Sequence, residues 1–166
     1  GGRIRELGRR QIAPSKIMTP KAFANALAVD MALGCSTNTT LHLAAIAHEA
    51  RVPFDLNQIN VISQKTPHLC SLSPGGAHHI EDLDRAGGIQ AVLKELFKGG
   101  HIDGTCMTVT GRTVADNIAE ARIKDPEVIR SKESAYHAAG GLAVLYGNLA
   151  PGGCVVKQTA VRAEML

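Results

Sequence analysis

Aromatic residues are scarce in this sequence of 166 residues. They make up 3% of the chain, with no Trp, two Tyr and three Phe. Proteins that bind single-stranded nucleic acid stack bases on aromatic side chains, so this composition argues against that class. The hydrophobic share is nevertheless 45%, which predicts a globular core built from Ala, Leu, Ile and Val.

Long apolar runs and a secretory signal pattern are also missing. No stretch approaches the roughly 18 apolar residues that a membrane-spanning helix needs, so we expect no membrane segment and a soluble, cytoplasmic protein. The formal net charge is only +3. The basic residues gather near the front, where we interpret them as a solvated helix face and expect no nucleic-acid partner: Arg3, Arg5, Arg9, Arg10 and Lys16.

Cysteines are few and widely spaced. Cys35, Cys70, Cys106 and Cys154 form no Cys-x-x-Cys pair. Such spacing favours four buried or half-buried thiols over a metal or cluster site, which the fold alone would have to assemble. The motifs of serine hydrolases, P-loop nucleotide binding and dinucleotide binding are missing too, and His42 and His48 are six residues apart, which excludes a zinc-protease helix.

A small polar loop, Gly-Cys-Ser-Thr-Asn-Thr at 34–39, lies between two Ala/Leu-rich stretches. Thr19-Pro20 predicts the start of a helix that runs to Leu33, and a second helix should follow the loop. Ser36, Thr37 and Asn38 are residue types that cap a helix N-terminus, where free N–H groups can also bind an anion. Both interpretations stay open, and the residues alone favour plain capping.

Two further polar features carry alternatives. Asp30 lies on an otherwise apolar turn, so it is either a buried functional carboxylate or, as we favour, a partly exposed Asp paired with a Lys. His78-His79, followed by Glu81, Asp82 and Asp84, has the spacing of a weak metal site. An acidic first turn at a helix N-terminus explains the same residues without a metal, and we favour that interpretation.

The remaining chain predicts short helices separated by extended segments. We expect a short helix after Asp55 or Asn57, an extended segment at 67–72, and helices from Ile80 and over 89–97. Residues 105–109 have β character, and Thr113 should cap another helix. Residues 125–139 form a connection, and two strands near 142–146 and 154–157 form a hairpin. Helices with short strands between them favour an α/β or α+β domain.

Several motifs in order resemble the dihydroxy-acid dehydratase and 6-phosphogluconate dehydratase family. The resemblance covers essentially the whole chain. The Cys-Ser-Thr-Asn-Thr and Gly-Asn-Leu-Ala-Pro segments are most similar to the dihydroxy-acid dehydratase branch. The matching segments are Asn-Ala-Leu-Ala-Val-Asp at 25–30, the loop and helix start at 34–43, Pro-His-Leu-Cys at 67–70, Ala-Gly-Gly-Ile at 86–89 and the glycine-flanked hairpin at 140–153.

The resemblance implies an internal part of a hydro-lyase that converts 2,3-dihydroxy carboxylates to 2-keto acids in valine and isoleucine biosynthesis. The implied fold is α/β: residues 1–124 would be the later, helix-rich, α/β/α-type part of the N-terminal domain. Residues 125–139 would be a connection, and residues 140–166 the first strands of a truncated C-terminal β-barrel domain.

The family uses an iron-sulfur cluster and Mg²⁺, held by motifs that this chain does not contain. We therefore expect neither cofactor to bind this chain alone, and none of the four cysteines matches a cluster ligand. No catalytic or metal-binding residue is predicted here. Only Ser36, Thr37 and Asn38 are expected to reach the active site, as a neutral hydrogen-bonding wall near the substrate carboxylate or the cluster.

Two other functions stay open at this point. The parent enzyme could act on a sugar acid of the 6-phosphogluconate type, or the segment could serve as a non-enzymatic binding or assembly module. In each case we expect a homo-oligomer, because apolar surface without its partners favours self-association.

Overall fold

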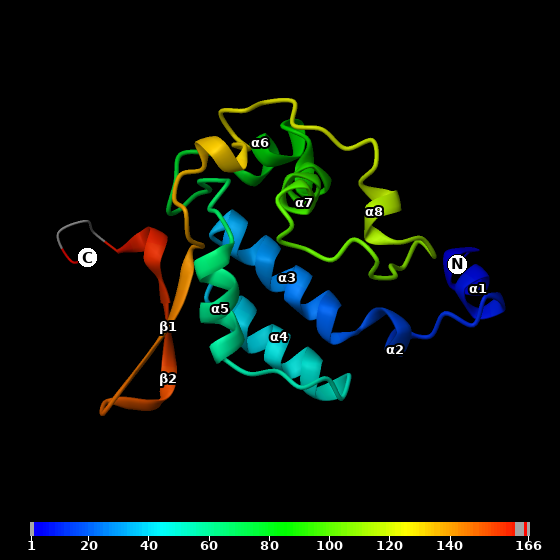
Figure 1. The fold of residues 1–166 in the computed structure, drawn as a ribbon, viewed down its shortest axis with the longest axis horizontal. Helices are drawn as coiled ribbons and strands as arrows, with labels where there is room; N and C mark the ends of the chain where they lie inside the picture. Colours follow the sequence, from blue (N-terminus) through cyan, green and yellow to red (C-terminus); the bar gives the residue numbers. More distant parts are fainter. Residues whose placement is uncertain (1, 162–164, 166) are drawn as a thin grey trace.

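The computed structural model describes residues 2–161 and 165, and its architecture is mainly helical with a hairpin near the C-terminal end (Figure 1). Helix α3 runs through the middle, with α6 and α7 on one side and α4 and α5 on the other. The helices are α1 (Gly2–Arg9), α2 (Pro14–Ile17), α3 (Pro20–Leu33), α4 (Asn38–Glu49), α5 (Asn57–Lys65), α6 (Ile80–Arg85), α7 (Gly88–Lys98) and α8 (Val114–Asn117). Two 3-10 turns, at Lys132–Ser134 and Gln158–Ala160, flank the hairpin of β1 (Leu142–Gly147) and β2 (Ala150–Lys157).

Helix α3 is the centre of the hydrophobic core because two of its faces are buried. Ala28 and Ala32, one turn apart, pack in a cluster with residues of α6 and α7 such as Leu83. Leu27 and Met31 face a second cluster, with residues of α5, β1 and β2. The helix therefore joins the helical part of the chain to the hairpin. Thr19 caps it as predicted, since its hydroxyl accepts the Ala22 N–H at 3.3 Å.

The hairpin is antiparallel, with Val144 opposite Val155, and α5 covers one edge of β1. The Asn60 side chain donates to the Val144 carbonyl at 2.8 Å and accepts the Val144 N–H at 2.7 Å. One turn later, the Ser63 hydroxyl donates to the Leu142 carbonyl at 2.7 Å. Side chains of α5 thus replace a neighbouring strand, and they satisfy backbone groups that an edge strand leaves unpaired.

Most of the predicted elements are confirmed, including the helices on either side of the 34–39 loop and both strands of the hairpin. The predicted β segment at 105–109 is wrong: it makes one isolated bridge, Met107 to Thr113, because the chain turns back at once through Gly111. In the described part of the chain, extended strands are confined to the hairpin. None of the described helices is long and apolar enough to cross a membrane.

Candidate active-site loop

The 34–39 loop begins at Gly34, which ends α3 in the left-handed conformation (φ 59°, ψ 47°). Its N–H and that of Cys35 return to carbonyls of the last turn of α3, including that of Asp30. A Cβ at Gly34 would lie 2.6 Å from His68 Nε2, and a Cβ at Gly141 would lie 2.6 Å from the Gly34 Cα. The start of the loop is therefore fixed between His68 and the hairpin, at a position that only Gly can occupy without strain.

Capping of α4 is confirmed, and Ser36 performs it. Its hydroxyl accepts the Asn38 N–H at 3.2 Å, and its carbonyl accepts the Thr39 N–H at 3.0 Å. Thr37 occupies the N-cap position without a side-chain bond, and its backbone is already helical. Ser36 and Asn38 are exposed and Thr37 is half-buried. The three predicted residues therefore form one continuous surface at the start of α4.

Asp30 differs from the favoured prediction. It is 4% exposed, and among the described residues neither carboxylate oxygen has a hydrogen-bond partner and no Lys or Arg pairs with it. Burial raises the pKa of Asp30 to about 6, against the opposing influence of the Thr39 hydroxyl, the Cys35 thiol and the Lys157 charge. The prediction of an exposed Asp paired with a Lys is wrong because this turn of α3 lies beneath the loop rather than at the surface.

His68 is the neighbour that sequence reasoning missed. It is 3% exposed, and its Nδ1 has no hydrogen-bond partner in the described part of the structure. Its ring stacks on His137 at 5.5 Å, and its backbone bridges to the same residue. Burial lowers the pKa of His68 to about 4, and the nearby His137 acts in the same direction. A buried neutral imidazole therefore supports the loop from below.

The His78-His79 segment begins α6, and its acidic residues act as predicted for a helix start. Asp82 accepts the His79 backbone N–H at 2.8 Å and also pairs with Arg85 at 3.3 Å. The backbone N–H of His79 lowers the pKa of Asp82 more than any other neighbour does. The carboxylate thus has a capping role.

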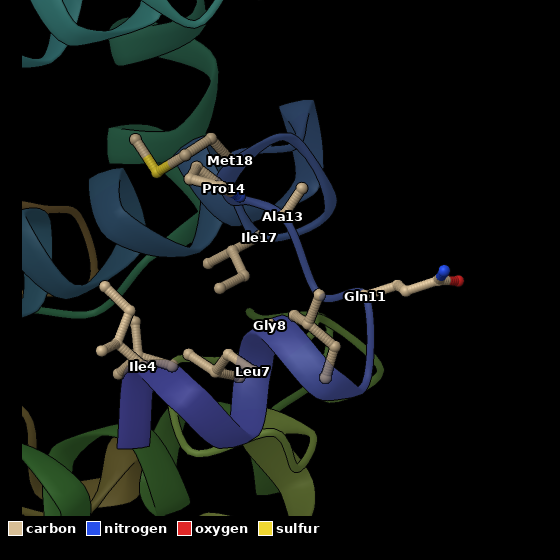
Figure 2. Close-up of a pocket in the computed structure, with 10 residues that line it drawn as sticks. Ile4, Leu7, Gly8, Gln11, Ala13, Pro14, Ile17 and Met18 are labelled. Atoms are coloured by element: carbon tan, nitrogen blue, oxygen red, sulfur yellow. The ribbon is translucent and has the colours of Figure 1, made fainter. Parts of the chain in front are cut away.

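An apolar groove lies far from the loop, beyond the N-terminal end of α3 (Figure 2). Its volume is about 690 Å³ and no charged side chain lines it. Ile4 and Leu7 of α1 face Ile17 across it, and Met18 also lines it. Gln11 is the one polar side chain among the residues that line the groove, and none of these residues is an acid or base, so we do not assign the active site to it.

The family model described as Dihydroxy-acid/6-phosphogluconate dehydratase N-terminal matches residues 1–117, and its C-terminal counterpart matches residues 127–166. The chain belongs to this dehydratase family. The resemblance of the loop and hairpin motifs is thereby confirmed over nearly the whole sequence.

Relatives in this dehydratase family are similar along the entire chain. A dihydroxy-acid dehydratase of Desulfatibacillum aliphaticivorans is 66% identical over 166 residues, and one of Desulfosudis oleivorans is 67% identical over 167 residues. A dihydroxy-acid dehydratase of Moorella thermoacetica is 58% identical. In each case the match covers 100% of this chain and 30% of the relative, so the chain spans about a third of the length of these dehydratases.

The four cysteines of this dehydratase segment differ in burial. Cys70 is buried and Cys35 is half-buried, and burial raises the pKa of each thiol to about 12. Cys106 is buried near Lys21 and Asp103, and Cys154 lies on β2. Cys154 is exposed, so the prediction of four buried or half-buried thiols is wrong for this residue. In the described ranges, no three His, Cys, Asp or Glu side chains converge on one point.

Proposed function

We propose that this chain is part of a dihydroxy-acid dehydratase that removes water from a 2,3-dihydroxy carboxylate to give a 2-keto acid in valine and isoleucine biosynthesis. The observation that carries the proposal is the identity of 66% and 67% to proteins named dihydroxy-acid dehydratase, maintained over the whole chain. The same relatives favour this substrate class over a sugar acid.

The reaction needs a base for the C2 proton and a Lewis acid for the C3 hydroxyl. The iron-sulfur cluster and Mg²⁺ of the family would supply the Lewis acid. Because no three His, Cys, Asp or Glu side chains converge among the described residues, we propose that these cofactors are not bound by this chain alone and that the chain alone does not catalyse dehydration.

The part that this chain would contribute is a wall of the substrate site. Ser36 and Asn38 are exposed at the start of α4, and the loop that carries them is fixed by Gly34 against His68. An Asn amide and a Ser hydroxyl on a rigid loop can orient a polyhydroxy acid by neutral hydrogen bonds, at little entropic cost on binding.

Asn38→Ala in a full-length dehydratase that carries this segment tests the loop assignment. Loss of one hydrogen bond to the substrate should raise KM about ten-fold, while iron and sulfide content stay normal. Asn57→Ala is the matched control, because Asn57 is also an exposed Asn in the first position of a helix. If KM is unchanged, or if cluster content falls together with activity, the loop is structural and the assignment is wrong.

The inactivity of the isolated chain can be tested directly. The 166-residue chain would be incubated with iron, sulfide and Mg²⁺ and then assayed for 2-keto acid formation. We expect no turnover, and measurable turnover would contradict the proposal.

We further propose a cytoplasmic homo-oligomer that acts without nucleic-acid or membrane partners, which light scattering and fractionation of the full-length enzyme would test.

A further inference from the structure

The Asp30 carboxyl is the least compensated polar group beneath the 34–39 loop. Its two oxygens are buried without hydrogen-bond partners in the described part of the chain, and its side chain lies against the Thr39 hydroxyl and the Cys35 thiol. Thr39 is the second residue of α4, so this carboxyl lies beneath the first turn of that helix. A buried charge without a partner is costly, which suggests that it serves the exposed face above it.

Two positive contributions act on this carboxyl. The first turn of α4 carries the partial positive charge of a helix N-terminus. Lys157 of β2 lies close enough to lower the pKa of Asp30, and it also acts on Cys35 and on His68. His68 and Cys35 are themselves neutral near pH 7, because their pKa values are about 4 and about 12. An ionised Asp30 therefore offsets both positive contributions.

A helix N-terminus with an adjacent Lys would normally attract a carboxylate. With Asp30 beneath it, the same surface presents hydroxyl, amide and N–H groups in a nearly neutral field. We propose that Asp30 is a specificity-determining residue that makes the 34–39 loop bind the hydroxyl groups of the substrate rather than its carboxylate. This inference rests on the proposed function, since it assumes that the loop lines the substrate site.

Two inhibitors, each with only one of the two polar parts of the substrate, test this inference. Isovalerate has a branched chain and a carboxylate without hydroxyl groups, and the corresponding uncharged diol has hydroxyl groups without a carboxylate. The inhibition constant of each would be measured at neutral pH on a full-length dehydratase that carries this segment. The ratio of the two constants reports the preference of the site, independently of the rate of chemistry.

Charge removal at Asp30 should change this ratio in one direction. Asp30→Asn should tighten inhibition by isovalerate about five-fold, as expected for loss of one nearby charge, and leave inhibition by the diol within about two-fold. Lys157→Met should weaken inhibition by isovalerate by a similar factor, and the double variant should return near the wild-type ratio. Glu95→Gln is the matched control, since Glu95 is also a buried acid, 8% exposed, but lies on α7.

The outcomes distinguish this inference from the proposed function. If Asn38→Ala raises KM but Asp30→Asn leaves the ratio unchanged, the loop lines the site and the inference is wrong. If Asn38→Ala has no effect, the loop assignment itself fails. If Asp30→Asn does not fold, the two inhibition constants of the wild-type enzyme are measured as a function of pH instead. Acidification from neutral pH to below about 6 neutralises Asp30, so inhibition by isovalerate should become tighter relative to inhibition by the diol. An unchanged ratio over that range would overturn the inference.

Discussion

Two polar regions, one at the junction of α5 and β1 and one beneath the 34–39 loop, differ in how their hydrogen bonds are satisfied. At the junction of α5 and β1, Asn60 makes two bonds to Val144 and Ser63 makes one to Leu142, all between 2.7 and 2.8 Å. Beneath the 34–39 loop, Asp30 and His68 have buried atoms without partners in the described residues. The first region joins two elements, whereas the second supports a surface loop.

The paired groups at the α5–β1 junction and the unpaired groups beneath the loop should affect the stability of the fold differently. Buried polar groups are normally paired, and a paired network makes the fold more specific. An unpaired buried carboxylate lowers stability, and Asp30 lies beneath the loop that we propose as a wall of the substrate site. Removing the charge of the unpaired Asp30 should therefore raise the free energy of unfolding, whereas removing the paired amide of Asn60 should lower it.

The largest effect is expected at Gly34, where the unsatisfied region is most tightly packed. Gly34→Ala places a Cβ 2.6 Å from His68 Nε2 in a left-handed backbone, and we expect it to lower the free energy of unfolding by about 4 kcal/mol. Urea denaturation of the chain measures this value. Gly100→Ala is the control, because Gly100 also has a positive φ of 73° but no atom within 4 Å of the added Cβ.

Strain alone should cost Gly100→Ala about 1 kcal/mol. If Gly34→Ala and Gly100→Ala lower the free energy of unfolding equally, the backbone conformation, and not the contact with His68, fixes the start of the loop.

Asp30→Asn should stabilise the chain, which is the opposite of the usual effect of a core substitution. Raising the pKa of Asp30 to about 6 in the folded chain means that the ionised carboxylate destabilises the fold, by about 3 kcal/mol. The group favours folding below its unfolded pKa, and this contribution is lost as pH rises through about 6. The gain from Asp30→Asn should therefore be complete at neutral pH and vanish near about pH 4.

His68 acts in the opposite direction over the same pH range. Its pKa is lowered to about 4, so its contribution to stability is lost as pH falls from the unfolded value toward 4. The contributions of Asp30 and His68 to the free energy of unfolding thus partly cancel in the wild-type chain. In Asp30→Asn, the fall in stability that His68 causes at acidic pH should therefore be larger. Urea denaturation at several pH values checks this. A gain independent of pH would show that Asp30 is not ionised in the folded chain.

The sequence predicted local features of both regions but not their burial. The Thr19 cap with Pro20 after it and the two strands of the hairpin depend on near neighbours in the sequence, and these predictions are confirmed. The exposure of Asp30 depends on contacts with Thr39 and Lys157, which lie on other elements. The one available signal was the apolar turn around Asp30. The site assignment of Ser36, Thr37 and Asn38 stays a prediction, as do the proposed domain boundaries.

Asn60→Ala should weaken the satisfied region by about 2 kcal/mol, because it leaves the buried N–H and carbonyl of Val144 without their partner. Asn57→Ala, three residues earlier on the same helix, removes an exposed amide and should change stability by less than about 0.5 kcal/mol. Urea denaturation and the exchange rate of the Val144 amide hydrogen measure the two effects. Equal losses would mean that α5 does not replace a strand at this edge.

The smallest effect is expected at Ser36, on the exposed side of the unsatisfied region. Ser36→Ala removes the acceptor of the Asn38 N–H and should cost about 0.5 to 1 kcal/mol, as for other helix caps. Ser36→Asp keeps an acceptor there, but it adds a second negative charge above Asp30, so the usual gain of an acidic cap should be reduced. Asp30→Asn should restore that gain. Additive effects of the two substitutions on the free energy of unfolding would show that Asp30 does not influence the exposed face of the loop.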